Sequence, residues 1–151
     1  MRKILIATDG SPEAREAVRY GLELAVEDEA AVTLLQVIPP TDWTKLEYGA
    51  LIRPEELRLR RGFALAEAEQ LGAEHGVSVT SDVVAGIPAD EIVTYADSID
   101  ADLIVIGSRG RGAVASALLG SVSRAVVQHA RRPVLVLRGM RLGVAKPLAT
   151  V

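Results

Sequence analysis

The sequence lacks the residues from which several common functional sites are built. It contains no cysteine, which excludes disulfide frameworks, thiolate zinc sites and cysteine nucleophiles. His75 and His129 are its only histidines, too few for a histidine-rich metal site. One phenylalanine, one tryptophan and three tyrosines offer little surface on which single-stranded nucleic acid could stack. No Gly-Lys pair occurs, which excludes a Walker-type phosphate loop.

Long hydrophobic runs are also missing. The apolar stretch near the N-terminus ends at Ala7, which is shorter than a signal peptide requires. No run approaches the ~18 apolar residues of a membrane span, so we expect a cytoplasmic protein that does not insert into a membrane. Of the 151 residues, 49% are hydrophobic and 25% charged, and the formal net charge is −3. This ordinary globular composition predicts one domain and gives no sign of a nucleic-acid-binding surface.

Short apolar runs alternate along the chain with segments of helical periodicity. The runs predict strands over residues 3–7, 31–38, 77–85, 102–106 and 133–137. The periodic segments predict helices over residues 12–27, 54–74, 88–98 and 121–130. Because strands and helices alternate, the sequence predicts a single-domain, three-layer α/β/α protein with a five-stranded parallel sheet.

Two of the predicted strands end in residues that suit a nucleotide. Thr8-Asp9-Gly10 follows the first strand, and the glycine-rich segment 107–112 follows the fourth. In open parallel sheets, ligands bind beyond the C-terminal ends of the strands. Glycines allow backbone N–H groups to approach an anion closely, and the helix that begins at Gly120-Ser121 adds partial positive charge there. Ser121 and Ser123 could add hydroxyl donors, and the Asp9 carboxylate would suit a ribose diol.

A glycine-rich loop alone also fits a tight turn between a strand and a helix. Residues 110–115 match the dinucleotide fingerprint G-x-G-x-x-A. That fingerprint, however, belongs after the first strand of its unit, with an acidic residue at the end of the next strand. The strand that follows here, residues 133–138, has no acid at its end. We therefore discount a dinucleotide site of that type.

The full spacing Gly107-x2-Gly110-x9-Gly120-Ser121 resembles the ATP-binding signature of the universal stress protein family. Further segments are similar to that family: Asp9-Gly10-Ser11 after the first strand, Gly86-Ile87-Pro88, Gly120-Ser121-Val122-Ser123, and Arg132-Pro133 before the last strand. The resemblance covers about residues 2–138. We therefore assign residues 1–138 as a universal stress protein domain and leave the C-terminal tail, residues 139–151, unassigned.

The resemblance implies a Rossmann-like sheet in the order 3-2-1-4-5, related to that of the adenine nucleotide alpha hydrolases. Asp9, helped by the backbone of Gly107, would hold the ribose, and the backbone of Val37 would read the adenine. Ala7 and Thr8 would line the base, and Gly110 and the first turn of the next helix would hold the phosphates. The expected nucleotide-binding residues are Ala7, Thr8, Asp9, Val37, Gly107, Ser108, Arg109, Gly110, Gly120, Ser121 and Val122.

The function that the resemblance implies is that of an ATP-binding regulatory protein of the stress response. Mg²⁺ or Mn²⁺ would be held mainly through the phosphates, and at most slow ATP hydrolysis is expected, because no nucleophile–base pair or carboxylate dyad is visible. The apolar edge strand Val134–Leu137 would pair with its own copy in a homodimer. Two alternatives stay open: a nucleotide-processing enzyme, such as a phosphotransferase or an adenylating enzyme, and a dimeric scaffold that binds no nucleotide.

The remaining distinctive residues favour structural roles. His75 and His129 each stand near the end of a predicted helix, where a histidine typically interacts with the helix dipole. Trp43 and Tyr48 lie in the predicted loop 41–53, where we expect them to cover the core or form a surface for a protein partner.

Replacing Gly110 or Gly120 by valine should abolish ATP binding without unfolding the domain. A branched side chain at either position would hinder the close approach of backbone N–H groups to the phosphates. Calorimetric titration with Mg-ATP measures the binding, and circular dichroism checks the fold. Wild-type affinity in both folded variants would refute the assignment of this loop.

Overall fold

The structure is a computed structural model of the chain, and it describes residues 1–39, 65–109 and 119–138. The strands are β1 (Lys3–Ala7), β2 (Ala31–Ile38), β3 (Val79–Ala85), β4 (Leu103–Gly107) and β5 (Val134–Leu137). The labelled helices are α1 (Pro12–Asp28), α4 (Pro88–Ser98) and α5 (Ser121–His129), and residues 65–74 form a further helix.

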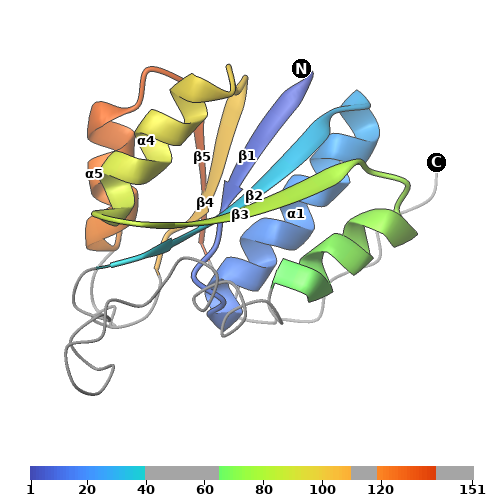
Figure 1. Cartoon of the computed structure of the whole chain (residues 1–151), viewed down its shortest axis with the longest axis horizontal. Coiled ribbons are helices and arrows are strands. Elements are labelled where there is room, and N and C mark those ends of the chain that lie inside the picture. The colour runs from blue at the N-terminus through green and yellow to red at the C-terminus, as the bar shows by residue number, and fades with distance from the viewer. Residues whose placement is uncertain (40–64, 110–118, 139–151) are drawn as a thin grey trace.

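All strand pairs are parallel, and the sheet order is β3-β2-β1-β4-β5. This confirms the predicted order. The winding reverses at β1, which lies between β2 and β4: Ala7 is opposite Leu35 on one side and Ile106 on the other. Figure 1 shows the consequence, with α1 and the helix of residues 65–74 on one face of the sheet and α4 and α5 on the other.

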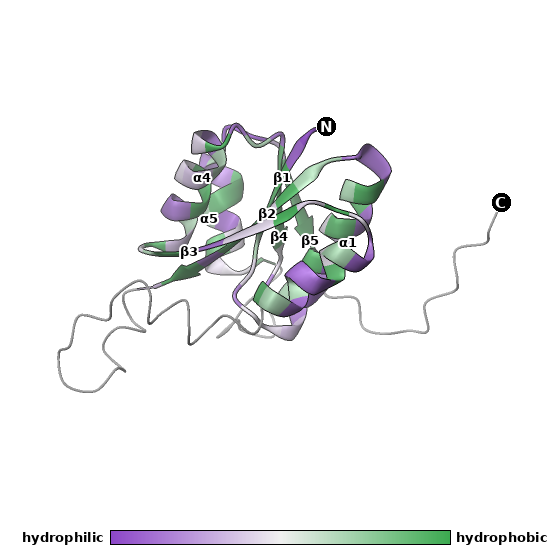
Figure 2. Ribbon diagram, turned by 45° about the vertical axis from the view of Figure 1, so that its right-hand side comes forward, coloured by the Kyte–Doolittle hydropathy of each residue, from purple (hydrophilic) through white to green (hydrophobic). Residues whose placement is uncertain are grey.

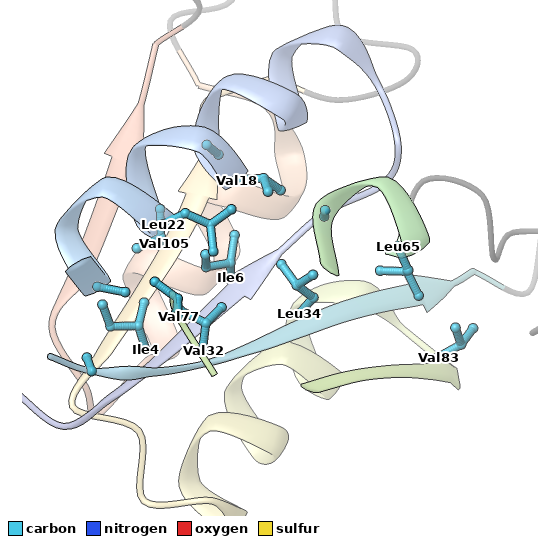
Figure 3. Close-up of a cluster of buried hydrophobic side chains, with 14 of the residues drawn as sticks. Ile4, Ile6, Val18, Leu22, Val32, Leu34, Leu65, Val77, Val83 and Val105 are labelled. Atoms are coloured by element: carbon cyan, nitrogen blue, oxygen red, sulfur yellow. The ribbon is translucent and has the colours of Figure 1, made fainter. Parts of the chain in front are cut away.

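The core consists of two layers because β1 is buried on both faces. Ile4 and Ile6 point toward α1, where they join Leu22 and Val105 (Figure 3). Leu5, between them, belongs to the layer under α4 and α5. A continuous apolar run is what a strand covered on both faces requires. In Figure 2, hydrophobic residues colour the middle of the sheet, whereas hydrophilic residues recur along the helices.

Helix α1 approaches β1 closely at Gly21. A Cβ atom added at Gly21 would lie 2.5 Å from Cδ1 of Ile6, which is fully buried. A larger residue would therefore require the Ile6 side chain or the helix to shift. This contact matters for the site because it sets the distance of α1, and with it the position of the α1 N-terminus, relative to the end of β1.

The predicted element bounds agree with the structure to within a few residues. The largest difference within the described residues is the start of β3, at Val79 instead of residue 77. Val77 still completes the end of the preceding helix, because its N–H donates to the carbonyl of Gly72 at 2.9 Å. Of the helix predicted over 54–74, residues 65–74 are helical, and the rest of that prediction lies outside the described residues.

Polar contacts tie together the N-terminal edge of the sheet. The Asp102 carboxylate accepts the N–H groups of Arg2 at 2.7 Å and Lys3 at 2.9 Å, and these bonds lower the pKa of Asp102. The Arg132 guanidinium contacts Asp97 at 3.0 Å and Asp100 at 3.2 Å, at the end of α4. The Arg132-Pro133 pair thus has a structural role at the edge opposite the predicted site.

Among the described residues, one buried polar side chain lacks a hydrogen-bond partner for one of its atoms. Gln36 on β2 is 1% exposed, and its Oε1 accepts no hydrogen bond. It lies between Leu34 and Ile38 on the sheet face that α1 covers. A buried acceptor without a partner costs about 1–3 kcal/mol.

Gln36→Met should therefore raise the free energy of unfolding, by about 1 kcal/mol, because the unbranched thioether has a similar shape and buries no amide. Urea denaturation of the two proteins measures the difference. Exposed Gln128→Met on α5 is the control for the chemical change alone. A variant less stable than wild type would show that the amide has a stabilising partner, such as a bound water molecule.

Candidate functional site

The ends of β1 and β4 meet at the C-terminal edge of the sheet. Ala7, the last residue of β1, is opposite Ile106, so that Thr8 and Gly107 follow side by side. Helix α1 begins after β1, and α5 begins beyond the loop that follows β4, on the other face of the sheet. This is the switch point, the place where doubly wound sheets bind ligands.

The segment after β1 forms a tight turn that fixes Asp9. Thr8 continues the sheet by donating its N–H to Leu35 O at 2.9 Å. Gly10 has a φ of 76°, a left-handed conformation that favours glycine, and its N–H donates to the Thr8 hydroxyl at 3.2 Å. Oδ1 of Asp9 accepts the N–H of Ser11 at 2.9 Å. This bond holds the half-buried Asp9 carboxylate just beyond the C-terminal end of β1.

The N-terminus of α1 is capped by its own sequence. Ser11 is the N-cap residue, its hydroxyl accepts the N–H of Ala14 at 3.2 Å, and Pro12 begins the helix. This agrees with the sequence Ser11-Pro12-Glu13, which is a typical pattern for the start of a helix. Because a serine side chain already satisfies part of this terminus, α1 has fewer backbone donors left for an anion than an uncapped helix would have.

The N-terminus of α5 differs, because no side chain caps it within the described residues. Its N-cap residue is Gly120, and the first bond of the helix runs from the N–H of Arg124 to Gly120 O at 3.0 Å. The N–H groups of Ser121, Val122 and Ser123 precede that bond and have no acceptor within the helix. The first turn also contains no acidic residue. This end of α5 therefore combines three backbone donors with the positive end of the helix dipole.

The start of α5 is attached to the end of β4 at Ser108. The Ser108 carbonyl accepts the N–H of Gly120 at 2.6 Å, and the Ser108 N–H donates to Leu137 O of β5 at 2.6 Å. Gly120 must approach closely, since an added Cβ atom would lie 3.2 Å from that carbonyl oxygen. The glycine-rich loop therefore has its two ends joined, and α5 begins directly beside the end of β4.

Gly107 lies beside the start of α1. An added Cβ atom would lie 3.3 Å from the carbonyl oxygen of Arg109, and 3.4 Å from that of Glu13 in the first turn of α1, which is ordinary contact distance. The end of β4 thus lies against the start of α1. As a result, Asp9, Arg109 and the first turn of α5 are attached to neighbouring strand ends.

The expected site residues fall into three groups in the structure. Ala7, Thr8, Val37, Gly107 and Ser108 are buried at the strand ends, Asp9, Arg109, Gly120 and Val122 are half-buried, and Ser121 is exposed. Gly110 lies outside the described residues, as do Trp43 and Tyr48. Two residues past Leu35, Val37 reaches the same edge of the sheet from β2.

The expectation that Ser123 offers a hydroxyl donor to a ligand was wrong. Its side chain is 2% exposed and donates inward, to the carbonyl oxygens of Ser108 at 3.0 Å and Gly120 at 3.1 Å. Sequence reasoning overlooked this role because serine spacing shows that two hydroxyls lie in one helical turn, not which way each turns. A serine at the third helical position does commonly bond back to a nearby carbonyl, which was the available signal.

Both histidines have the structural role that their positions predict. Nδ1 of His75 lies 2.7 Å from Leu71 O, and Nδ1 of His129 lies 2.8 Å from Ala125 O. Because a carbonyl oxygen only accepts, Nδ1 carries the proton in each ring. Over residues 1–39, 65–109 and 119–138, no group of three acidic, histidine or cysteine side chains is arranged to hold a metal ion, and no helix is long and apolar enough to cross a membrane.

The parallel sheet, the helices that cover both of its faces and the reversal of strand order at β1 define a Rossmann-like α/β protein. The model of the universal stress protein family matches residues 1–138, and the chain belongs to that family. Universal stress protein MJ0531 of Methanocaldococcus jannaschii is 34% identical over 139 residues, which are 91% of this chain and 82% of that protein. The Mycolicibacterium smegmatis relative is longer, and this chain matches 48% of it at 32% identity.

Solved structures share the fold. Hypothetical protein MJ0577 superimposes with a TM-score of 0.82 at 29% identity, over 92% of this chain and 96% of that one. A universal stress protein of Archaeoglobus fulgidus in complex with dAMP has a TM-score of 0.69 at 26% identity, over 90% and 97% of the two chains. Another universal stress protein, in complex with cAMP, also has a TM-score of 0.69, at 25% identity over 91% and 96%.

Proposed function

We propose that this protein binds ATP at the switch point between β1 and β4 and acts as a nucleotide-dependent regulator of the stress response. The observation that carries the proposal is the start of α5, which has no side-chain cap among the described residues and is attached beside the end of β4, next to β1 and the Asp9 that follows it. The dAMP and cAMP complexes of structurally similar family members support an adenine nucleotide as the ligand.

The phosphates would bind at the first turn of α5. Ser121, Val122 and Ser123 provide backbone N–H donors there, and the exposed Ser121 hydroxyl can add another. Gly120 contributes differently from what its place in the motif implies, because its own N–H is used by Ser108 O. Its small size is what lets the helix start against β4. Arg109, half-buried in the loop that follows β4, would complete the site with a positive charge.

The ribose and adenine would extend from this point across β1 toward β2. Asp9 accepts the Ser11 N–H through one oxygen, and a carboxylate can accept several bonds at once, so the held carboxylate suits the ribose hydroxyls. Val37, near the end of β2, would supply backbone groups for the adenine edge, with Ala7 and Thr8 beneath the base.

A divalent cation, Mg²⁺ or Mn²⁺, would accompany ATP. The proposal keeps it on the phosphates and water, as Mg²⁺ commonly binds in nucleotide sites. The cation would supply charge neutralisation for the phosphates. Residues of the chain hold and orient the nucleotide, and we propose at most slow hydrolysis of it.

The direct test is to denature the freshly purified protein and identify any released nucleotide by mass spectrometry, followed by calorimetric titration with Mg-ATP. We expect ATP, released or bound, at one per chain. An absence of nucleotide in the released material, together with no binding of ATP, ADP or AMP, would contradict the proposed function.

Asp9→Asn should weaken ATP binding by roughly ten- to a hundredfold, because hydrogen bonds to a charged group contribute about 1.5–3 kcal/mol. Asparagine keeps an oxygen for the Ser11 N–H but loses the charge. The loss should be smaller with 2′-deoxy-ATP, which lacks one of the hydroxyls that Asp9 would bind. Calorimetry with both nucleotides measures it.

Asp100→Asn is the matched control, since Asp100 is an exposed acid between α4 and the start of β4, at the opposite edge of the sheet. It should bind both nucleotides like the wild type. Equal weakening of ATP and 2′-deoxy-ATP binding in Asp9→Asn would argue against the ribose contact.

We further propose that two copies associate through β5. Within the described residues β5 pairs with β4 alone, and all four of its residues are half-buried. Leu135 packs toward the α1 face and Val136 toward the α5 face, so each contributes apolar surface at the edge. An apolar, unpaired edge strand favours association with another strand.

Sedimentation equilibrium should show a dimer at micromolar concentration. An arginine or lysine on a sheet edge opposes such pairing, so Val136→Lys should shift the protein toward the monomer. A strict monomer of the wild-type protein at these concentrations would refute the association.

A further inference from the structure

We infer that Ser123 is a positioning residue for the phosphate-binding amides of α5. The inference rests on the proposed function and gives Ser123 a role that differs from that of a ligand donor. Its hydroxyl would set the direction in which the N–H groups of Ser121, Val122 and Ser123 point, by fixing the first turn of the helix to the end of β4.

The anchor is the carbonyl oxygen of Ser108, which receives two donors from the start of α5. Gly120 donates its N–H at 2.6 Å, and Ser123 donates its hydroxyl at 3.0 Å. A carbonyl oxygen has two lone pairs, and both are used here. The hydroxyl also lies 3.1 Å from Gly120 O, so its proton is shared between two carbonyls. These hydrogen bonds are shielded from water, because Ser108 is 3% and Ser123 2% exposed.

Among the described residues, these two bonds are the directional contacts that hold the start of α5 to the end of β4. The other contacts of α5 with the sheet are apolar: Val126 is fully buried, and Val122 and Ala125 pack against the same cluster. Apolar contacts press the helix onto the sheet without selecting its rotation, because the hydrophobic effect is non-directional. No side chain caps the start of α5 in the described residues. One bond at Gly120 would leave rotation about that bond, whereas a second, three residues later, removes it.

The anchor itself is fixed by the sheet. The N–H of Ser108 donates to Leu137 O at 2.6 Å, and Leu137 is the partner of Gly107 in the β4–β5 ladder. Ser108 therefore connects the α5 amides to the end of the sheet: its N–H bonds to β5, and its carbonyl oxygen accepts both bonds from the start of α5. Loss of the Ser123 hydroxyl would leave Ser108 O with one donor, so the fold should survive while the first turn gains freedom.

The consequence is specific to the phosphates. In the proposed complex the α5 amides bind the phosphates, whereas the base and ribose lie near β1 and β2. Ser123→Ala should therefore weaken ATP binding about tenfold, which is the effect of losing about one hydrogen bond to the phosphates. Adenosine binding should change less than about twofold. The ratio of the two affinities is the measured quantity, since a general loss of stability would lower both together.

Two variants sharpen the test. Ser123→Thr keeps a hydroxyl that can reach the same carbonyls and should restore the wild-type ratio. Ser98→Ala is the matched control: Ser98 donates to Tyr95 O at 2.7 Å, the same three-residue back-bond, at the end of α4 away from the site. It should leave both affinities unchanged.

The experiment is titration calorimetry of the four proteins with Mg-ATP and with adenosine, with circular dichroism as the check on folding. A lowered ATP-to-adenosine affinity ratio in Ser123→Ala alone supports the inference. An unchanged ratio in a folded Ser123→Ala overturns it while leaving nucleotide binding intact, whereas a wild type that binds no nucleotide contradicts the proposed function instead. If Ser123→Ala does not fold, Ser123→Cys, with similar volume and a weaker donor, replaces it. Failure of both to fold would make Ser123 a residue of stability and overturn the inference.

Discussion

The burial of β1 on every side determines much of the rest of this structure. Its residues pair with β2 on one edge and β4 on the other, and its side chains enter both core layers. A strand so enclosed cannot lie at an edge or face solvent, so the chain must wind outward from it in both directions. The reversal of winding places the end of β1 beside the end of β4. The candidate site exists because those two ends meet.

The two edges of the sheet differ in how their polar groups are satisfied. At the N-terminal edge, carboxylates and Arg132 join neighbouring segments, and the charged groups have partners within the chain. At the C-terminal edge, α1 is capped by Ser11, whereas α5 begins at a glycine that no side chain of the described residues caps. In the first arrangement, the hydrogen bonds and ion pairs of these charged groups are made within the protein. The second leaves backbone N–H groups of α5 without an acceptor in the helix, which is the arrangement that suits an anion.

Three serines of similar appearance in the sequence act in three ways. Ser11 accepts an N–H and caps α1, Ser123 donates to buried carbonyls and anchors α5, and Ser121 remains exposed at the start of the same helix. Hydroxyl groups donate and accept equally well, so their roles follow from which backbone groups lie nearby. In this protein the useful property of Gly120 is likewise its small size, because its own N–H is already used.

The sequence by itself determined the class of fold and predicted where the candidate site lies. Buried parallel strands require continuous apolar runs and amphipathic helices require a period of 3.6, and both patterns are readable residue by residue. The capping of α1 and the end-of-helix histidines were predictable for the same reason, because each depends on neighbours within a few positions. The direction of the Ser123 hydroxyl, the use of the Gly120 N–H and the unsatisfied Gln36 were not. These depend on how closely segments distant in the chain approach one another, and only the packing of α5 against the end of β4, and of α1 over β2, decided them.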